Sequence, residues 1–73
     1  MKQYYFRISV SYSDYQNYYS GHASSVLVTT DEGLRIQLPA SHFRPYLTYS
    51  GIRGRFRLIT DNYNKFQSLE LIT

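Results

Sequence analysis

Three arginines at alternate positions are the residues of this chain best suited to chemistry. Arg53, Arg55 and Arg57 lie in the segment G-I-R-G-R-F-R-L-I-T, residues 51–60. Because the side chains of a β-strand alternate between its two faces, all three guanidinium groups would share one face. Guanidinium groups suit planar, bidentate contacts with anions. The segment therefore predicts an anion-binding face, although the solvated face of an amphipathic strand explains the same alternation equally well.

Two residues upstream extend this candidate set. His42 and Arg44 lie in the segment P-A-S-H-F-R-P-Y-L, residues 39–47, which precedes the arginine segment. A neutral surface histidine is the simpler interpretation of His42, and contact with an anion together with Arg44 is the alternative. The candidate anion-binding residues are thus His42, Arg44, Arg53, Arg55 and Arg57.

Catalytic chemistry is not expected from this sequence. An acid–base or nucleophilic site needs a histidine, a carboxylate and a nucleophile held together. The sequence contains no catalytic or phosphate-binding motif. It has no cysteine, and its two histidines lack a nearby acidic cluster, which disfavours a metal site. Four of the five carboxylates fall at expected turns or at a helix start: Asp14, Asp31, Glu32 and Asp61. We therefore expect a protein that is not an enzyme and holds no cofactor or metal ion.

The charge balance favours an anionic partner, though modestly. Eight lysines and arginines against five aspartates and glutamates give a net charge of +3, and six of the eight cations are arginine. Nucleic acid is the first candidate, because small β-barrels often combine cationic side chains with aromatic rings on which bases stack. Exposed Tyr5, Tyr49 or Tyr63 could supply such rings. The nine tyrosines and four phenylalanines are equally explained as the rim of a small core.

The length bounds the domain organisation. The 73 residues allow one domain, spanning 1–73. Such a chain buries only about 60% of the surface that it exposes when unfolded, so its stability as a monomer is marginal. Formation of a homodimer is therefore retained as an alternative source of stability. No apolar run approaches the roughly 20 residues of a membrane span. The N-terminal residues enter a strand pattern at once and lack the apolar segment of a signal peptide, so the expected location is the cytoplasm, without membrane contact.

The first half of the chain reads as a strand, a short helix and a hairpin. Residues 3–12 alternate between apolar and polar positions and predict a strand. Ser13 and Gln16 have the spacing of a capping box, which predicts a helix over residues 14–20. A hairpin is expected over residues 24–38. The helix would dock through Tyr15, Tyr18 and Tyr19 and end at Gly21 and His22. The hairpin would turn at 31–33, with Leu34, Ile36 and Leu38 pointing inward.

The second half reads as a helical turn and two strands. Pro45 limits a helix beginning at Ser41 to a single turn. The arginine strand at 51–60 would bury Ile52, Phe56 and Leu58, and the last strand would run over 65–72 with an irregularity at Phe66. The helical turn would be anchored by Phe43, Tyr46 and Leu47, and Leu69 and Leu71 would share one face of the last strand.

These elements predict a mainly β fold. It would be a five-stranded bent antiparallel sheet or a small SH3-like or OB-like barrel. One short helix follows the first strand, and a single helical turn precedes the fourth.

Four segments carry a resemblance to a known family. They are Q-Y-Y-F near the start, L-P-A-S-H-F-R-P-Y-L-T at 38–48, G-I-R-G-R-F-R-L at 51–58 and N-K-F-Q-S-L at 64–69. Over its full length the chain resembles a family of short gammaproteobacterial proteins known only as a domain of unknown function. The resemblance implies no activity, cofactor or binding residue. It indicates that residues 38–48 and the arginine strand form one unit, which would place Arg44 with the three alternating arginines.

Two classes of function stay open. The first is a non-enzymatic binding module whose arginine face meets an anionic partner, with nucleic acid as the first candidate. The second is a protein–protein adaptor or a homodimeric domain, in which an edge strand pairs with a partner or a second copy. The availability of the arginines bears on the choice. Glu70 on the last strand could neutralise one of them, whereas an adjacent Arg7 would add to the charge.

Overall fold

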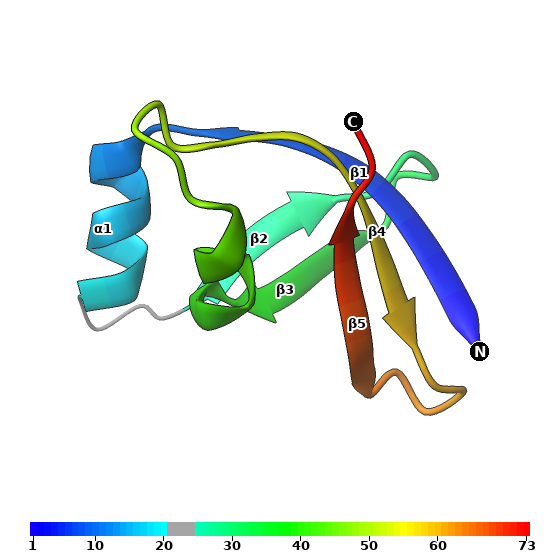
Figure 1. Cartoon of the computed structure of the whole chain (residues 1–73). Coiled ribbons are helices and arrows are strands. Elements are labelled where there is room, and N and C mark those ends of the chain that lie inside the picture. The colour runs from blue at the N-terminus through cyan, green and yellow to red at the C-terminus, as the bar shows by residue number, and fades with distance from the viewer. Residues whose placement is uncertain (21–24) are drawn as a thin grey trace.

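The computed structural model describes residues 1–20 and 25–73, and of residues 18–20 the backbone alone. It confirms the predicted mainly β class with five antiparallel strands, a short helix and a helical segment before the fourth strand (Figure 1). The elements are β1 (Lys2–Val10), α1 (Tyr12–Ser20), β2 (Ser25–Thr29), β3 (Arg35–Pro39), the 3₁₀ helix η1 (Ala40–Tyr46), β4 (Ile52–Thr60) and β5 (Phe66–Leu71).

The five strands are divided between two sheets. One sheet has the order β1-β4-β5, and β2 and β3 form the other. The long strands β1 and β4 run side by side through the molecule (Figure 1). An isolated bridge between Phe6 and Thr30 joins the sheets, and the Asp31 N–H donates to the Tyr5 carbonyl at 2.8 Å. The strands therefore follow a curved path around one interior, with two sheets in place of one continuous sheet.

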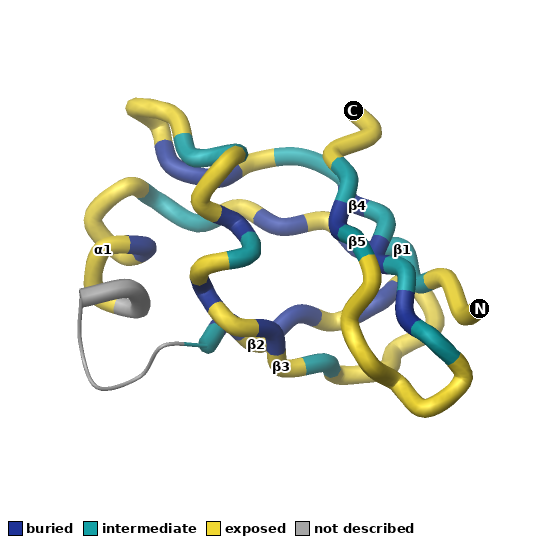
Figure 2. The backbone as a smooth tube through the Cα atoms, turned by 60° about the horizontal axis from the view of Figure 1, so that its bottom comes forward, coloured by how far each residue is buried: buried dark blue, intermediate teal, exposed yellow. Residues whose placement is uncertain are grey.

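The core lies between the inner faces of these sheets. Phe6 on β1 stacks on Phe56 of β4 with ring centroids 5.7 Å apart. Phe43 of η1 meets both rings edge-on, at 6.2 and 5.6 Å. The predicted inner positions of β4, Ile52, Phe56 and Leu58, are all buried. Figure 2 shows buried positions recurring along β1 and β4, while the β4–β5 turn and the C-terminal residues are exposed. Strand alternation thus gives β4 one apolar face and one face in contact with solvent.

The helix α1 begins two residues earlier than predicted. Ser13 was the expected N-cap, but the Asp14 N–H donates to Ser11 Oγ at 3.2 Å and the helix starts at Tyr12. Ser11 offers the same hydroxyl and lies directly after β1, so it caps the helix as soon as the strand ends. Tyr12 therefore belongs to the helix, and the predicted end of the strand at residue 12 is wrong.

The helix docks through Tyr15. This side chain is buried, and its hydroxyl donates to the Ala40 carbonyl at 2.8 Å, at the start of η1. Docking through the tyrosine face is confirmed for this residue. The other predicted contributors lie outside the described side chains: Tyr18, Tyr19, Gly21 and His22.

The helical segment before β4 is longer than the predicted single turn. Its seven residues form a 3₁₀ helix that contains Pro45, whose fixed φ angle is compatible with 3₁₀ geometry. Phe43 is fully buried, and the Tyr46 hydroxyl donates to the Leu69 carbonyl of β5 at 2.5 Å. Tyr46 and Leu47 pack against the core while staying partly exposed. The segment thus ties β5 to the interior.

The last strand carries the predicted irregularity. Ile59 pairs with Ser68, but the next residue of β4, Thr60, pairs with Phe66, so one residue of β5 is bulged out. Leu69 is buried as expected. Leu71, predicted to share the face of Leu69, is 45% exposed at the end of β5.

Candidate anion-binding face

The register of β1 and β4 assembles the candidate face. Arg53, Arg55 and Arg57 lie on the outer face of β4, as the alternation predicts. Across on β1 they meet, in order, Ser9, Arg7 and Tyr5. The outer face therefore holds four guanidinium groups, and we call Arg7, Arg53, Arg55 and Arg57 the arginine face.

Arg57 is neutralised by the last strand. Its guanidinium forms an ion pair with Glu70, the directly opposite residue of β5. The hydrogen bond to Glu70, followed by one to Tyr5 and by the Glu70 charge, raises the pKa of Arg57 above its ordinary value. A raised pKa means that the folded state favours the charged guanidinium, which therefore stays protonated. Arg57 is thus a cation already committed to a partner.

Arg55 is neutralised by the other sheet. It forms an ion pair with Asp31, which lies in the turn between β2 and β3. Its guanidinium carbon also lies 5.6 Å from the centroid of the Tyr5 ring, within the range of a cation–π contact. Both side chains of the pair are partly exposed, so the interaction contributes modestly to stability, about 0.2–1 kcal/mol.

Arg53 and Arg7 carry the uncompensated charge. Arg53 donates to Ser9 Oγ and, at 3.1 Å, to the Ser50 carbonyl, both neutral acceptors. Within residues 1–20 and 25–73, no carboxylate pairs with Arg53, and the exposed Arg7 side chain forms neither a hydrogen bond nor an ion pair. Arg7 lies directly opposite Arg55 and diagonal to Arg53. The uncompensated positive charge is therefore concentrated at the end of the arginine face near α1.

His42 and Arg44 do not share this face. Both belong to η1, whose Phe43 and Tyr46 rings pack on Phe56 at 5.6 and 5.3 Å, on the inner side of β4. The His42 ring stacks on Phe66 with centroids 3.8 Å apart and planes 7° apart, so it borders β5. The unit formed by residues 38–48 and β4 is real, but it is a packing unit built on the apolar face.

The three tyrosines singled out from the sequence have different environments. Tyr5 lies under Arg55 and is half-buried. Tyr49 is fully exposed and precedes Ser50, whose carbonyl accepts from Arg53. Tyr63 is 85% exposed in the turn between β4 and β5. Tyr49 is therefore the free ring closest along the chain to the uncompensated end of the arginine face.

Sequence reasoning missed two members of the site. Ser9 carries no signal that distinguishes it from other strand residues, and Asp31 was interpreted only as a turn residue. The partnership of Asp31 with Arg55 depends on the bridge between Phe6 and Thr30, which joins residues 24 positions apart. No local sequence pattern predicts such a bridge. The pairing of Glu70 with an arginine could be predicted, because consecutive strands usually pair.

In the described ranges, no group of three or more histidine, cysteine, aspartate or glutamate side chains is arranged to hold a metal ion. Among the same residues, no helix has the length and hydropathy that crossing a membrane requires.

The chain matches a known protein family. The model of a family described as "Protein of unknown function (DUF2835)" matches residues 2–72. No curated protein matches the chain. No solved structure matches it either.

Proposed function

The chain belongs to this family of proteins of unknown function, and we propose that it is a non-enzymatic module that binds nucleic acid through the arginine face. The observation that carries the proposal is the pair Arg7 and Arg53, two exposed guanidinium groups on adjacent strands without a carboxylate partner in the described part of the chain. A protein that retains like charges side by side accepts a loss of stability, which a polyanionic ligand would reverse.

The form of the site favours an extended polyanion. The face lies on the outer side of the β1–β4 pair, and three of its four cations follow the direction of β4. Ser9 can contribute a hydroxyl between the cations, and the exposed Tyr49 ring is available for stacking on a base. Phosphate groups of a nucleic acid recur along its backbone and so suit such a row. A cytoplasmic location is part of the same proposal.

Salt-dependent binding tests the proposal. Affinity for labelled single- and double-stranded oligonucleotides is measured by fluorescence anisotropy at increasing salt. If Arg7 and Arg53 each neutralise one phosphate, log K should fall with log salt on the duplex with a slope near −2, since each contact contributes about −0.9. The doubly substituted protein, Arg7→Gln with Arg53→Gln, should bind about tenfold or more weakly and show a slope near zero.

A matched control separates the face from the overall charge. Arg35→Gln with Lys65→Gln removes the same charge from two other exposed positions, on β3 and before β5. Neither residue belongs to the arginine face, and exposed charges away from the ligand are partly screened by salt, so this variant should lose only about twofold in affinity. Equal losses in both double variants, or no binding to either oligonucleotide at low salt, would show that the arginine face is only a solvated strand face.

A further inference from the structure

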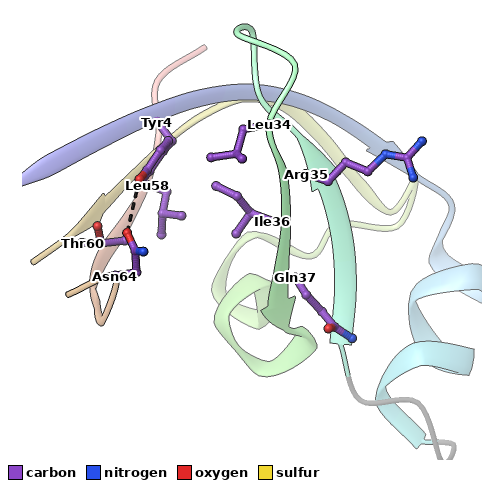
Figure 3. Close-up of a pocket in the computed structure, with 8 residues that line it drawn as sticks. All are labelled: Tyr4, Leu34, Arg35, Ile36, Gln37, Leu58, Thr60 and Asn64. Atoms are coloured by element: carbon purple, nitrogen blue, oxygen red, sulfur yellow. Dashed lines mark hydrogen bonds between the residues drawn. The ribbon is translucent and has the colours of Figure 1, made fainter. Parts of the chain in front are cut away.

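A cavity of about 300 Å³ lies between the two sheets, with Leu58 of the inner face of β4 and Ile36 of β3 in its lining (Figure 3). Its lining comes from β1, β3, β4 and the β2–β3 and β4–β5 turns: Tyr4, Leu34, Arg35, Ile36, Gln37, Leu58, Thr60 and Asn64.

The walls of the cavity are mainly apolar. Ile36 of β3 and Leu34, which directly precedes β3, point toward Leu58 and Tyr4 across the gap (Figure 3). Leu34 is 49% exposed although it occupies an inward position. The sequence correctly predicts that these side chains turn inward, yet the two sheets do not close over them. Covering apolar surface of this kind with another apolar side chain is favourable, because it removes that surface from water.

The edge of β3 borders the same cavity. The Thr30 N–H donates to the Leu34 carbonyl at 2.8 Å, and the register continues through the pair Val28 and Ile36. Main-chain groups of an antiparallel strand alternate in direction, so those of Arg35 and Gln37 point away from β2. The side chains of Arg35 and Gln37 turn away from the cavity in Figure 3, and these residues therefore line it with their main chain.

Cations flank this edge. Among the described residues that line the cavity, none is acidic. The Lys2 ammonium donates to Asn64 Oδ1 at 3.2 Å, at the wall opposite β3. The Arg35 side chain lies on the outward face of β3, where it would neighbour the nearest outward side chains of a strand added to the edge.

We infer that this edge and cavity bind an extended peptide that alternates apolar and acidic residues. The peptide backbone pairs with the N–H and carbonyl groups of Arg35 and Gln37, as in other strand additions to an open sheet edge. Its apolar side chains enter the cavity, and its acidic side chains lie on the opposite face beside Arg35. Pairing of β3 with a second copy is less suited, because β3 is short, ends in Pro39, which lacks an N–H, and carries a cation.

Strand addition predicts a signature in nuclear magnetic resonance. The ¹⁵N-labelled full chain is titrated with short synthetic peptides that alternate glutamate with valine, leucine or phenylalanine. The amides of Arg35 and Gln37 should shift, and their hydrogen exchange should slow by about tenfold or more, because they become hydrogen-bonded. A peptide that is N-methylated at alternate residues on its pairing edge cannot donate these bonds, and it should bind about tenfold or more weakly.

Two leucines of one hairpin provide matched variants. Leu34→Glu places a carboxylate at the mouth of the cavity and should weaken peptide binding by about tenfold or more, through charge repulsion and loss of apolar contact. Leu27→Glu introduces the same change on the outer face of β2, at a side chain that is 61% exposed, and should leave binding unchanged. Both positions are exposed enough for the variants to fold.

Several outcomes would overturn the inference. One is the absence of shifts at Arg35 and Gln37 with every peptide. Another is unchanged binding in Leu34→Glu or with the N-methylated peptide. Slow exchange of the same amides that depends on protein concentration, without peptide, would assign the edge to a second copy. The Arg7→Gln with Arg53→Gln variant should keep peptide binding intact, so the peptide site and the nucleic-acid proposal can fail separately.

Discussion

Gly51 fixes the position of the arginine strand relative to β1. Its φ angle is +100°, and a Cβ atom built there would lie 1.9 Å from the Val10 carbonyl oxygen and 2.8 Å from the Tyr12 nitrogen. The start of β4 therefore passes directly against the junction of β1 and α1. This close approach sets the register in which Arg53 faces Ser9, because β4 begins at the next residue.

Substitution of this glycine should be severely destabilising. In Gly51→Ala the positive φ costs about 1–2 kcal/mol, and displacement of β4 from the β1–α1 junction adds further loss. Gly33→Ala is the control, since Gly33 also has a positive φ, +89°, but open space around it. Urea denaturation should show a loss of free energy of unfolding that is clearly larger at position 51. Equal losses would mean that the close approach has no energetic consequence.

At the scale of the element, α1 depends on one cap and one docking contact. Nine residues are too few for a helix to persist alone in water. The Ser11 cap satisfies a free N–H of the first turn, and the buried Tyr15 hydroxyl attaches the helix to Ala40. Capping by Ser11 also fixes the change from strand to helix directly after Val10. This is the backbone segment against which Gly51 packs.

The cap assignment gives a direct comparison between two serines. Ser11→Ala should reduce the free energy of unfolding by about 1 kcal/mol, within a range of roughly 0.5–2, because the Asp14 N–H loses its acceptor. Ser13→Ala, two residues on in the first turn of the helix, should change it by about 0.5 kcal/mol or less. Thermal and urea denaturation of both variants measures the difference. A larger effect at Ser13 would restore the capping box predicted from the sequence.

At the scale of the whole molecule, local sequence patterns predict the helices and strands. Contacts between residues far apart in the sequence determine the charge of the arginine face and the shape of the cavity. Alternation along β4 is a property of neighbouring residues, so it identifies both the buried row and the arginine row. The charge that remains on that row depends on Asp31, which reaches Arg55 from the other sheet. The cavity likewise depends on how far apart the sheets stand at Leu34 and Leu58, which no single segment encodes.

The ion pair between the sheets should act on stability and binding in opposite directions. Asp31→Asn removes the partner of Arg55, which should lower the free energy of unfolding by about 0.2–1 kcal/mol. It also frees a third guanidinium beside Arg7. Affinity for duplex DNA at low salt should therefore rise severalfold, with a log–log salt slope steeper by about 0.9.

The neighbouring residue supplies the control for this prediction. Glu32→Gln changes the net charge from +3 to +4, as Asp31→Asn does, but Glu32 forms no ion pair within the described ranges. It should leave stability unchanged and the salt slope close to that of the unsubstituted protein, because it adds no cation to the arginine face. If both variants bind more tightly by the same factor, the overall field of the protein explains the gain. A gain confined to Asp31→Asn would show that Asp31 limits the number of arginines that reach the ligand.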